Sequence, residues 1–349
     1  MWQGAAIRLF WTTGENMLKA RTIRGILVGG AAFAMQASAG LAHAQDATPK
    51  PDFQTFLRGV EADAVARGIR PQTAAEALTG VEHIDRVIEL DRKQPEFTFT
   101  LQDYLARVVS KQKVEKGRRM MAENRALLTA IGKKYGVQPK YVVALWGIET
   151  DYGRVTGGYS VVSALATLAY DGRRSSYFRG ELMNALSVID GGHITAQSMR
   201  GSWAGAMGQC QFMPSSFLKF AEDWDGDGRR DIWGTRADVL ASAANYLAQS
   251  GWKGNETWGR PVKLPGNFSP RLIGLDQKQA VTEWGRLGVR AINGKPLPKS
   301  SVEGSIIRPD NGGGAAFLVY DNFRTTMKWN RSTSFALAVG HLAEKIGGK

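Results

Sequence analysis

The chain has 349 residues, of which 43% are hydrophobic and 22% charged, and this composition predicts one large or two modest globular units. Its formal net charge of +13 predicts a polyanionic partner, such as nucleic acid, anionic lipid or an acidic cell-wall polymer. The single cysteine, Cys210, excludes an intrachain disulfide, and we expect it to be a small buried packing residue.

The N-terminal segment has the pattern of a secretory signal. From Met17, a basic stretch precedes an apolar, small-residue run over 25–41, which ends in Ala42-His43-Ala44. This A-x-A end predicts that residues 1–44 are a signal peptide cleaved near Ala44, with Met17 as an alternative start. An uncleaved membrane anchor is the rival interpretation, but the many Gly and Ala residues favour cleavage.

Export narrows the choice of partner. Residues 1–44 hold four Lys/Arg and one acid, so the exported chain keeps a net charge of +10. Export argues against nucleic acid as the partner. No later apolar run approaches the ~18 residues of a membrane span, so we expect no stable membrane anchor. Cys210 lies far from the cleavage site, which excludes a lipid-modified N-terminal cysteine.

Helical patterns fill most of the chain up to about residue 250. A helical segment is predicted over 53–80, with its N-cap at Asp52 or a later polar residue, and a long helical stretch over 98–135. The basic block Lys111–Arg119 is interpreted as a solvated face that could also touch an anionic polymer. Further helices are predicted over 139–150, 160–170 and 176–190, from Pro214, and from a capping box at Thr235-Arg236-Ala237-Asp238 to about Ser250.

The residue pattern changes after Gly251. Proline, glycine and short alternating stretches predict strands and loops, as in Pro261–Pro265 and Ala315–Tyr320, before a last helix over Ser334–Ile346. We therefore predict a predominantly α, α+β fold. A helical core over about 53–250 is followed by a mixed β-rich part and closing helix over about 251–349, packed on the core.

Glu149 is the first candidate for chemistry. The residues three, four and seven positions before it are Trp146, Leu145 and Val142, so the acid shares the apolar stripe of a helix. A carboxyl against Trp and Leu loses water, which disfavours its charged form and suits a general acid. The alternative is a helix-end glutamate that turns outward or caps a neighbouring group.

A second dense segment spans residues 201–216. Three glycines and two alanines in its first eight positions remove side-chain bulk, so that backbone can approach a ligand or another element closely. Ser202, Gln209 and Gln211 are interleaved polar groups that could bind amides and hydroxyls. The alternative is tight helix packing, and core positions are expected for Met207, Phe212 and Met213.

The segments 145–154 and 201–216 resemble those of the lytic murein transglycosylase B family, whose members cut bacterial peptidoglycan. Other blocks resemble the family in the same order: Asp171-Gly172-Arg173-Arg174, Ala244-Asn245-Tyr246, Asn322-Phe323-Arg324 and Trp329-Asn330-Arg331-Ser332. The resemblance covers nearly all of the chain after residue 44. It implies a lysozyme-like catalytic core with a small β-rich part, and a periplasmic enzyme.

The resemblance also implies site residues. The acid/base glutamate of the family falls on Glu149, and substrate-binding positions fall on Ser202, Gln211, Arg173, Arg174, Tyr246 and Asn330. A cleft tyrosine of some members falls on Phe335, which loses the hydroxyl. For the arginines, a carboxylate of the cell wall and a structural salt bridge are the alternatives. Four tryptophans could stack on sugar faces, with core packing as the alternative for each: Trp146, Trp203, Trp224 and Trp233.

The implied reaction is cleavage between N-acetylmuramic acid and N-acetylglucosamine with formation of 1,6-anhydro ends, in which Glu149 acts first as acid and then as base. Ordinary retaining or inverting hydrolysis needs a second carboxylate. Asp151 is the nearest candidate, but two positions along a helix it faces away from Glu149.

The alternatives are a muramidase-type hydrolase of the same bond and a non-catalytic peptidoglycan-binding protein. Partners from cell-wall or envelope machinery are compatible with either.

Residues 223–234 resemble a calcium-binding loop. Acids stand at positions 1, 3, 5 and 9 with glycine at position 6, in the order of an EF-hand, but position 12 is Gly234 in place of a bidentate Glu. Two interpretations stay open, a structural Ca²⁺ site and a metal-free turn neutralised by arginines. No cofactor is expected to be required for catalysis. The candidate metal ligands are Asp223, Asp225, Asp227, Asp231 and the backbone carbonyl of Arg229.

Overall fold

The computed structural model describes residues 51–93, 100–309 and 314–348. The predicted signal peptide over 1–44 lies outside these ranges. Within them, no helix combines the length and the apolar character that crossing a bilayer requires. The helices are α1 Phe53–Ala66, α2 Pro71–Leu78, α3 Asp85–Lys93, α4 Leu101–Val108, α5 Lys111–Glu123, α6 Arg125–Tyr135, α7 Pro139–Thr150, α8 Val161–Asp171, α9 Ser175–Asp190, α10 Pro214–Phe220, α11 Arg236–Gln249, α12 Val281–Arg286, α13 Asp321–Trp329 and α14 Thr333–Ile346.

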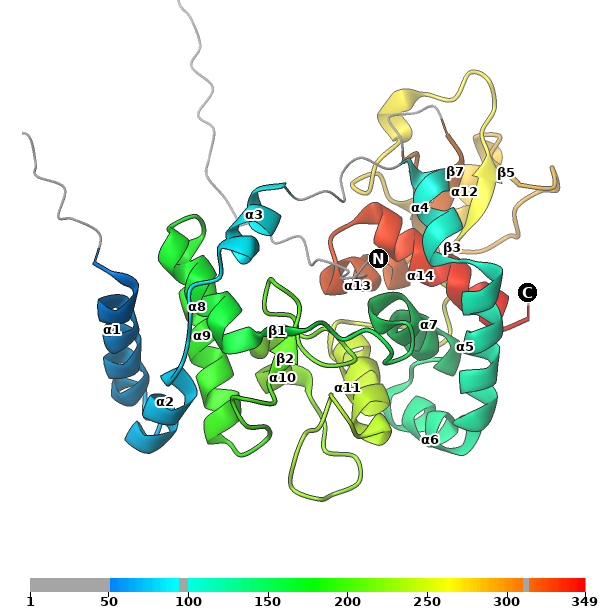
Figure 1. Cartoon of the computed structure of the whole chain (residues 1–349). Helices are drawn as coiled ribbons and strands as arrows, with labels where there is room; N and C mark the ends of the chain where they lie inside the picture. The colour runs from blue at the N-terminus through cyan, green and yellow to red at the C-terminus, as the bar shows by residue number, and fades with distance from the viewer. Residues whose placement is uncertain (1–50, 94–99, 310–313, 349) are drawn as a thin grey trace, which may run out of the picture.

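The helices form two groups that meet near the short strands β1 and β2 (Figure 1). In the first group, α8 packs along α9, α1 and α2 contact α9, and α3 contacts α8. In the second group, α7 lies among α5, α6, α11 and α14. β1 Tyr159–Ser160 and β2 Arg200–Gly201 pair antiparallel, with Tyr159 opposite Gly201.

Helix α7 is buried all round. Pro139 occupies its first turn, where the missing N–H costs no hydrogen bond, and every residue from Tyr141 to Thr150 is buried. A helix without a solvated face belongs to the interior of a large domain. The predicted apolar stripe is therefore too narrow a description of this segment.

A five-stranded antiparallel sheet follows the helical part, in the order β4-β6-β7-β3-β5. In the register, Gly259 of β3 lies opposite Val319 of β7, and Ser305 of β6 lies opposite the same valine. The strands are β3 Gly259–Lys263, β4 Gln279–Ala280, β5 Arg290–Ala291, β6 Glu303–Ile307 and β7 Ala316–Val319.

This sheet separates two hydrophobic cores. Successive side chains of a strand point to opposite faces. Phe317 and Val319 of β7 accordingly join the main core of the helices, whereas Ala316 and Leu318 join a smaller core centred on Trp284 of α12. The β-rich part thus has a core of its own and also shares one sheet face with the helical part.

Most predicted helices are present, but the longer ones are divided. Asp52 caps α1 by accepting hydrogen bonds from the N–H groups of Gln54 and Thr55, as predicted. The segment 53–80 breaks near Gly68, whose φ of +90° is left-handed and ends the first helix. The stretch 98–135 is likewise divided into α4, α5 and α6 in its described part.

The predicted capping box before α11 is wrong, although the helix itself is confirmed over Arg236–Gln249. Thr235 makes no side-chain cap. Its hydroxyl donates instead to Asp231, and the buried carboxylate of Asp238 accepts the N–H groups of Trp224 and Asp231. Asp238, which the local pattern assigned to the cap of α11, therefore binds backbone N–H groups of the preceding loop instead.

Candidate active site

Glu149 stands in the last turn of α7 with only 1% of its surface exposed. The interpretation as an outward-turned helix-end glutamate is therefore wrong. Its neighbours Leu145 and Trp146 are 1% and 3% exposed, so the carboxyl is surrounded by buried groups. Removal of water favours the neutral form of a carboxyl, which is the form that can donate a proton.

Trp329, the last residue of α13, reaches Glu149 from across the fold. Its Nε1 donates a hydrogen bond of 2.6 Å to Oε1 of Glu149, and the indole is 2% exposed. The Trp329 ring packs at 4.6 Å from the ring of Tyr246 and 5.2 Å from that of Phe212, measured between centroids. The acid thus meets a tryptophan whose ring packs on aromatic rings of two other segments.

Tyr104 of α4 also lies within electrostatic reach of Glu149. Burial raises the pKa of the Tyr104 hydroxyl, and the negative charge of Glu149 raises it further. A phenol with a raised pKa stays protonated and can donate a hydrogen bond. Sequence patterns gave Tyr104 and Trp329 no role at the site. Tyr104 lies in the predicted helical stretch 98–135, whereas Trp329 ends α13, a helix that the sequence patterns do not predict.

The C-terminal end of α7 is held by side chains of α5. Lys113 donates from Nζ to the carbonyl oxygen of Gly147 at 2.9 Å, and Lys116 donates to that of Asp151 at 2.8 Å. Cations at this end of a helix also complement its dipole. The interpretation of the basic block as a solvated face is therefore wrong for these two lysines, which fix the turn that carries Glu149.

Asp151 is not a second catalytic carboxylate in this arrangement. It ends α7 in the left-handed conformation, with φ of +51°. Burial alone would raise its pKa, but hydrogen bonds from Arg154 at 2.6 Å and Lys116 at 3.3 Å outweigh burial and hold the pKa below its ordinary value. Asp151 is therefore a helix-end residue whose carboxylate is engaged by two cations.

The segment 201–216 packs directly on this end of α7. Thr150 donates from Oγ1 to the carbonyl oxygen of Gln209 at 3.0 Å, and Nε1 of Trp146 donates to Oε1 of Gln209 at 2.8 Å. Gln209 is therefore a structural link between the two segments. The small residues serve close packing, because a Cβ on Gly201 would collide with the carbonyl of Ala206.

Ser202 and Gln211 are buried in this segment, at 4% and 2% exposure. The Ser202 hydroxyl accepts the N–H of Ala206 at 3.1 Å. The Gln211 amide nitrogen donates to the carbonyl oxygens of Thr156 and Gly208, which leaves its oxygen as the group able to accept from a ligand. Gln211 also has φ of +48°, a strained conformation of the kind that clusters at functional sites.

The arginine pair lies between α8 and α9, in the first helix group. Arg173 and Arg174 both pair with Asp91 of α3, which is 2% exposed. The Arg174 guanidinium also stacks over the Phe178 ring at 5.0 Å. Arg173 is half-exposed and can reach further partners, whereas Arg174 is mostly committed to Asp91.

Tyr246 and Asn330 lie beside Trp329, and Phe335 lies in the following helix α14. The Tyr246 hydroxyl donates to the carbonyl oxygen of Lys328 at 2.7 Å, and Asn330 Oδ1 accepts the N–H of Ser332 at 3.0 Å. Phe335, in the first turn of α14, is 1% exposed. Phe335 is therefore a core residue in this chain.

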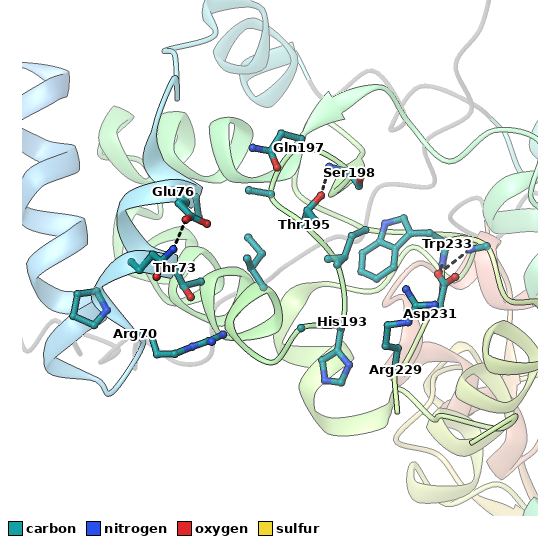
Figure 2. Close-up of a pocket in the computed structure, with 18 residues that line it drawn as sticks. Arg70, Thr73, Glu76, His193, Thr195, Gln197, Ser198, Arg229, Asp231 and Trp233 are labelled. Atoms are coloured by element: carbon teal, nitrogen blue, oxygen red, sulfur yellow. Dashed lines mark hydrogen bonds between the residues drawn. The ribbon is translucent and has the colours of Figure 1, made fainter. Parts of the chain in front are cut away.

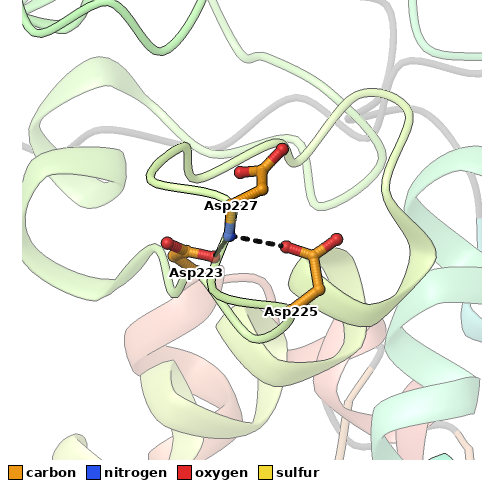
Figure 3. Close-up of side chains that lie close together, drawn as sticks. All are labelled: Asp223, Asp225 and Asp227. Atoms are coloured by element: carbon orange, nitrogen blue, oxygen red, sulfur yellow. Dashed lines mark hydrogen bonds between the residues drawn. The ribbon is translucent and has the colours of Figure 1, made fainter.

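Three carboxylates of the acidic loop converge (Figure 3). Oxygen atoms of Asp223, Asp225 and Asp227 lie within 4.8 Å of one another, and the three side chains are partly to fully exposed. Asp231 instead accepts the N–H groups of Trp233 and Gly234, each at 2.8 Å. Three of the predicted ligands therefore form one cluster, and Asp231 shapes the end of the loop.

A separate polar cavity of about 910 Å³ lies between α2, the segment after α9 and residues 229–234 (Figure 2). Its walls include neither Glu149 nor Ser202 nor Gln211. Trp233 stands in its wall, packs on Phe217 and donates from Nε1 to the carbonyl oxygen of Arg200. This cavity is not part of the arrangement around Glu149.

The site thus supplies one buried carboxyl that can donate and later accept a proton, surrounded by aromatic and amide side chains. Such a set suits acid/base work at an acetal oxygen.

Comparisons with known proteins agree with this chemistry. Residues 52–344 match the model of the transglycosylase SLT domain. Membrane-bound lytic murein transglycosylase B of Escherichia coli is 30% identical over 291 residues, which cover 80% of this chain and 79% of that protein.

Two solved structures extend the similarity to the fold. SltB3 from Pseudomonas aeruginosa, in complex with NAG-anhNAM-pentapeptide, is 42% identical with a TM-score of 0.82, covering 85% of this chain and 80% of that one. Escherichia coli Slt35, in complex with calcium, is 29% identical with a TM-score of 0.72, covering 86% and 94%. The predicted lysozyme-like, mostly helical fold is confirmed. The chain therefore belongs to the SLT transglycosylase-domain family and is a lytic murein transglycosylase of the B type.

Proposed function

We propose that this enzyme cleaves the bond between N-acetylmuramic acid and N-acetylglucosamine in peptidoglycan strands and leaves 1,6-anhydro ends. The observation that carries the proposal is the carboxyl of Glu149, which is buried at the end of α7 and accepts a hydrogen bond from Trp329 of α13. SltB3 was solved with an anhydro-muropeptide, which supports the same product here.

In the proposed mechanism, the protonated carboxyl of Glu149 gives its proton to the glycosidic oxygen as the C1–O bond breaks. The 2-acetamido group of the substrate stabilises C1, as in other substrate-assisted glycosidases. The resulting carboxylate then removes the proton of the muramoyl 6-hydroxyl, whose oxygen bonds to C1. Glu149 ends in its starting protonation state, and no water is consumed.

The other site residues are proposed to bind the strand. The Gln211 amide oxygen and the Ser202 hydroxyl offer acceptors for N-acetyl N–H and hydroxyl groups. Arg173 has an exposed guanidinium for a lactyl or peptide carboxylate, while Arg174 orients it through Asp91. Tyr246 and Asn330 complete the proposed binding set through their positions beside Trp329.

Mass spectrometry of muropeptides released from purified sacculi tests this proposal. We expect products with anhydro-muramoyl ends, each lighter by one water than a hydrolysis product. Reducing muramoyl ends as the main product would instead support a muramidase. Binding to sacculi without release of soluble products would support a non-catalytic wall-binding protein.

We also propose that the enzyme works in the periplasm after loss of residues 1–44. Support comes from the A-x-A motif and from a relative that is named a lytic murein transglycosylase. Fractionation of cells producing the full chain, with N-terminal sequencing of the mature protein, tests this. Recovery of an uncleaved chain with the membranes contradicts it.

The Asp223–Asp227 cluster is proposed to hold a structural Ca²⁺ that is not required for the chemistry. Convergence of three carboxylates fits a hard cation. The loop pattern predicts the backbone carbonyl of Arg229 as a further oxygen ligand. Slt35 was solved in complex with calcium. Position 12 is Gly234 in place of a bidentate Glu, and the Asp231 carboxylate already accepts the N–H groups of Trp233 and Gly234. Both features predict weaker binding than in a full EF-hand.

A further inference from the structure

The contact between Trp329 and Glu149 joins two residues that are 180 positions apart in the chain. Both are almost completely buried, at 2% and 1% exposure, and the donor–acceptor distance is 2.6 Å. Such a short hydrogen bond between buried groups has a larger effect than one at the surface, because the surroundings screen it little.

An indole N–H can donate a hydrogen bond but cannot accept one. The two oxygens of Glu149 are therefore not equivalent. In a neutral carboxyl the carbonyl oxygen is the better acceptor, so the bond from Trp329 makes Oε1 the carbonyl oxygen and leaves the proton on Oε2. A hydroxyl or amide partner would allow both arrangements, because each can donate and accept.

The indole cannot easily turn away from this position. Trp329 packs on the rings of Tyr246 and Phe212, and Tyr246 is itself tied by its hydroxyl to the carbonyl of Lys328, the residue before Trp329. The N–H of Asn330 donates to Thr326, which holds the chain at the end of α13. The donor is thus preorganised by its packing against two aromatic rings.

We propose that Trp329 is a positioning residue that assigns the catalytic proton of Glu149 to Oε2 and stabilises the carboxylate after proton transfer. This inference rests on the proposed role of Glu149. Before the transfer, the indole bonds to a neutral carbonyl oxygen. Afterwards it bonds to an anion, and charge-assisted hydrogen bonds are roughly twice as strong. The contact therefore favours the step in which Glu149 loses its proton.

Two replacements at position 329 test the proposal through kinetics on a defined muropeptide oligosaccharide. Trp329→Phe removes the N–H and part of the ring, whereas benzothienylalanine at 329 keeps the bicyclic shape and removes only the N–H. For both we expect kcat to fall about ten- to hundredfold while KM stays within about twofold. Wild-type kcat for the benzothienylalanine variant would overturn the proposal.

A matched control is Trp284→Phe, which removes another buried indole whose Nε1 donates to a carbonyl oxygen, that of Gly304. Because Trp284 lies in the second core, we expect lower stability with unchanged kcat for the folded enzyme. An equal fall in kcat for this control would assign the effect to general loosening of the fold.

An independent readout is the indole N–H resonance in ¹H–¹⁵N spectra of the ten-tryptophan chain. Glu149→Gln should shift the Trp329 resonance and leave that of Trp284 in place. An unshifted Trp329 signal contradicts the contact itself. Full activity of Glu149→Gln would overturn the proposed function, whereas an inactive Glu149→Gln beside fully active Trp329 variants would overturn only the present inference.

Discussion

Glu149 and the aspartates of the 223–227 cluster are acidic groups in opposite surroundings. Glu149 is 1% exposed and receives the indole N–H of Trp329. Asp223, by contrast, accepts three backbone N–H groups of its own loop, from Gly226, Asp227 and Gly228. The backbone N–H of Arg229 holds the pKa of Asp227 in this loop below its ordinary value, whereas Glu149 is removed from water. The difference separates a carboxyl suited to proton transfer from carboxylates suited to a cation.

The largest expected effect is the loss of turnover when Glu149, the more buried of these acids, is replaced. Glu149→Gln keeps the shape of the side chain and removes the exchangeable proton, so we expect turnover of sacculi to fall by about 10²–10⁴-fold. The melting temperature should stay level or rise, because a buried carboxyl is replaced by a neutral amide. Asp225→Asn is the control from the loop and should retain full turnover. Similar losses in both variants would break the comparison.

Asp91 is an intermediate case, as buried as Glu149 but paired with two arginines. Arg174→Ala leaves a buried carboxylate with one half-exposed partner, so we expect the free energy of unfolding to fall by about 2–3 kcal/mol in urea titrations. Arg173→Ala should cost less than about 1 kcal/mol, because its guanidinium is half-exposed, and should mainly raise KM. Equal losses of stability would show that the two guanidinium groups share Asp91 evenly.

Calcium bound at the Asp223–Asp227 cluster should raise the melting temperature and leave kcat unchanged. At 100 times its dissociation constant, a ligand that binds only the folded state adds about 2.7 kcal/mol, which corresponds to a rise of about 5 °C in melting temperature for a chain of this size. Calorimetry with and without CaCl₂ measures this shift, and Asp225→Asn should abolish it. A calcium-dependent kcat, with no change in melting temperature, would contradict a purely structural role.

The smallest effect is expected at Asp151, next to the catalytic turn. Its pKa is held below the ordinary value of 3.8, so its ion pairs stabilise the fold above that pH and lose this contribution as the pH falls through the folded-state value. Asp151→Asn, which tolerates the left-handed backbone, should lower the unfolding free energy by about 1 kcal/mol at pH 7. In urea titrations at successively lower pH the difference should shrink, and a constant difference would argue against the ion pairs.

Local patterns predicted much of the fold because the hydrophobic period and the caps of a helix lie within a few neighbouring residues. The bounds of α7, α8 and α9 follow from periodicity, and the Asp52 cap follows from one side chain. The division of the stretch 98–135 has a local sign that periodicity misses, because the Ser110 side chain accepts the N–H of Lys113 and caps the start of α5. The capping box failed for a related reason, since Asp238 serves residues of a preceding loop.

The sequence by itself determined the candidate acid, because Glu149 follows a run of apolar residues that no surface helix would carry. It also indicated that backbone comes close to another group in the glycine-rich segment after residue 200, without deciding between a ligand and a neighbouring element. Only the tertiary structure decided which groups meet that acid. Trp329 and Tyr104 come from α13 and α4, and the lysines that hold the end of α7 come from α5. Contacts between distant segments depend on the packing of whole helices, so the partners of a buried carboxyl cannot be read from its own neighbourhood in the chain.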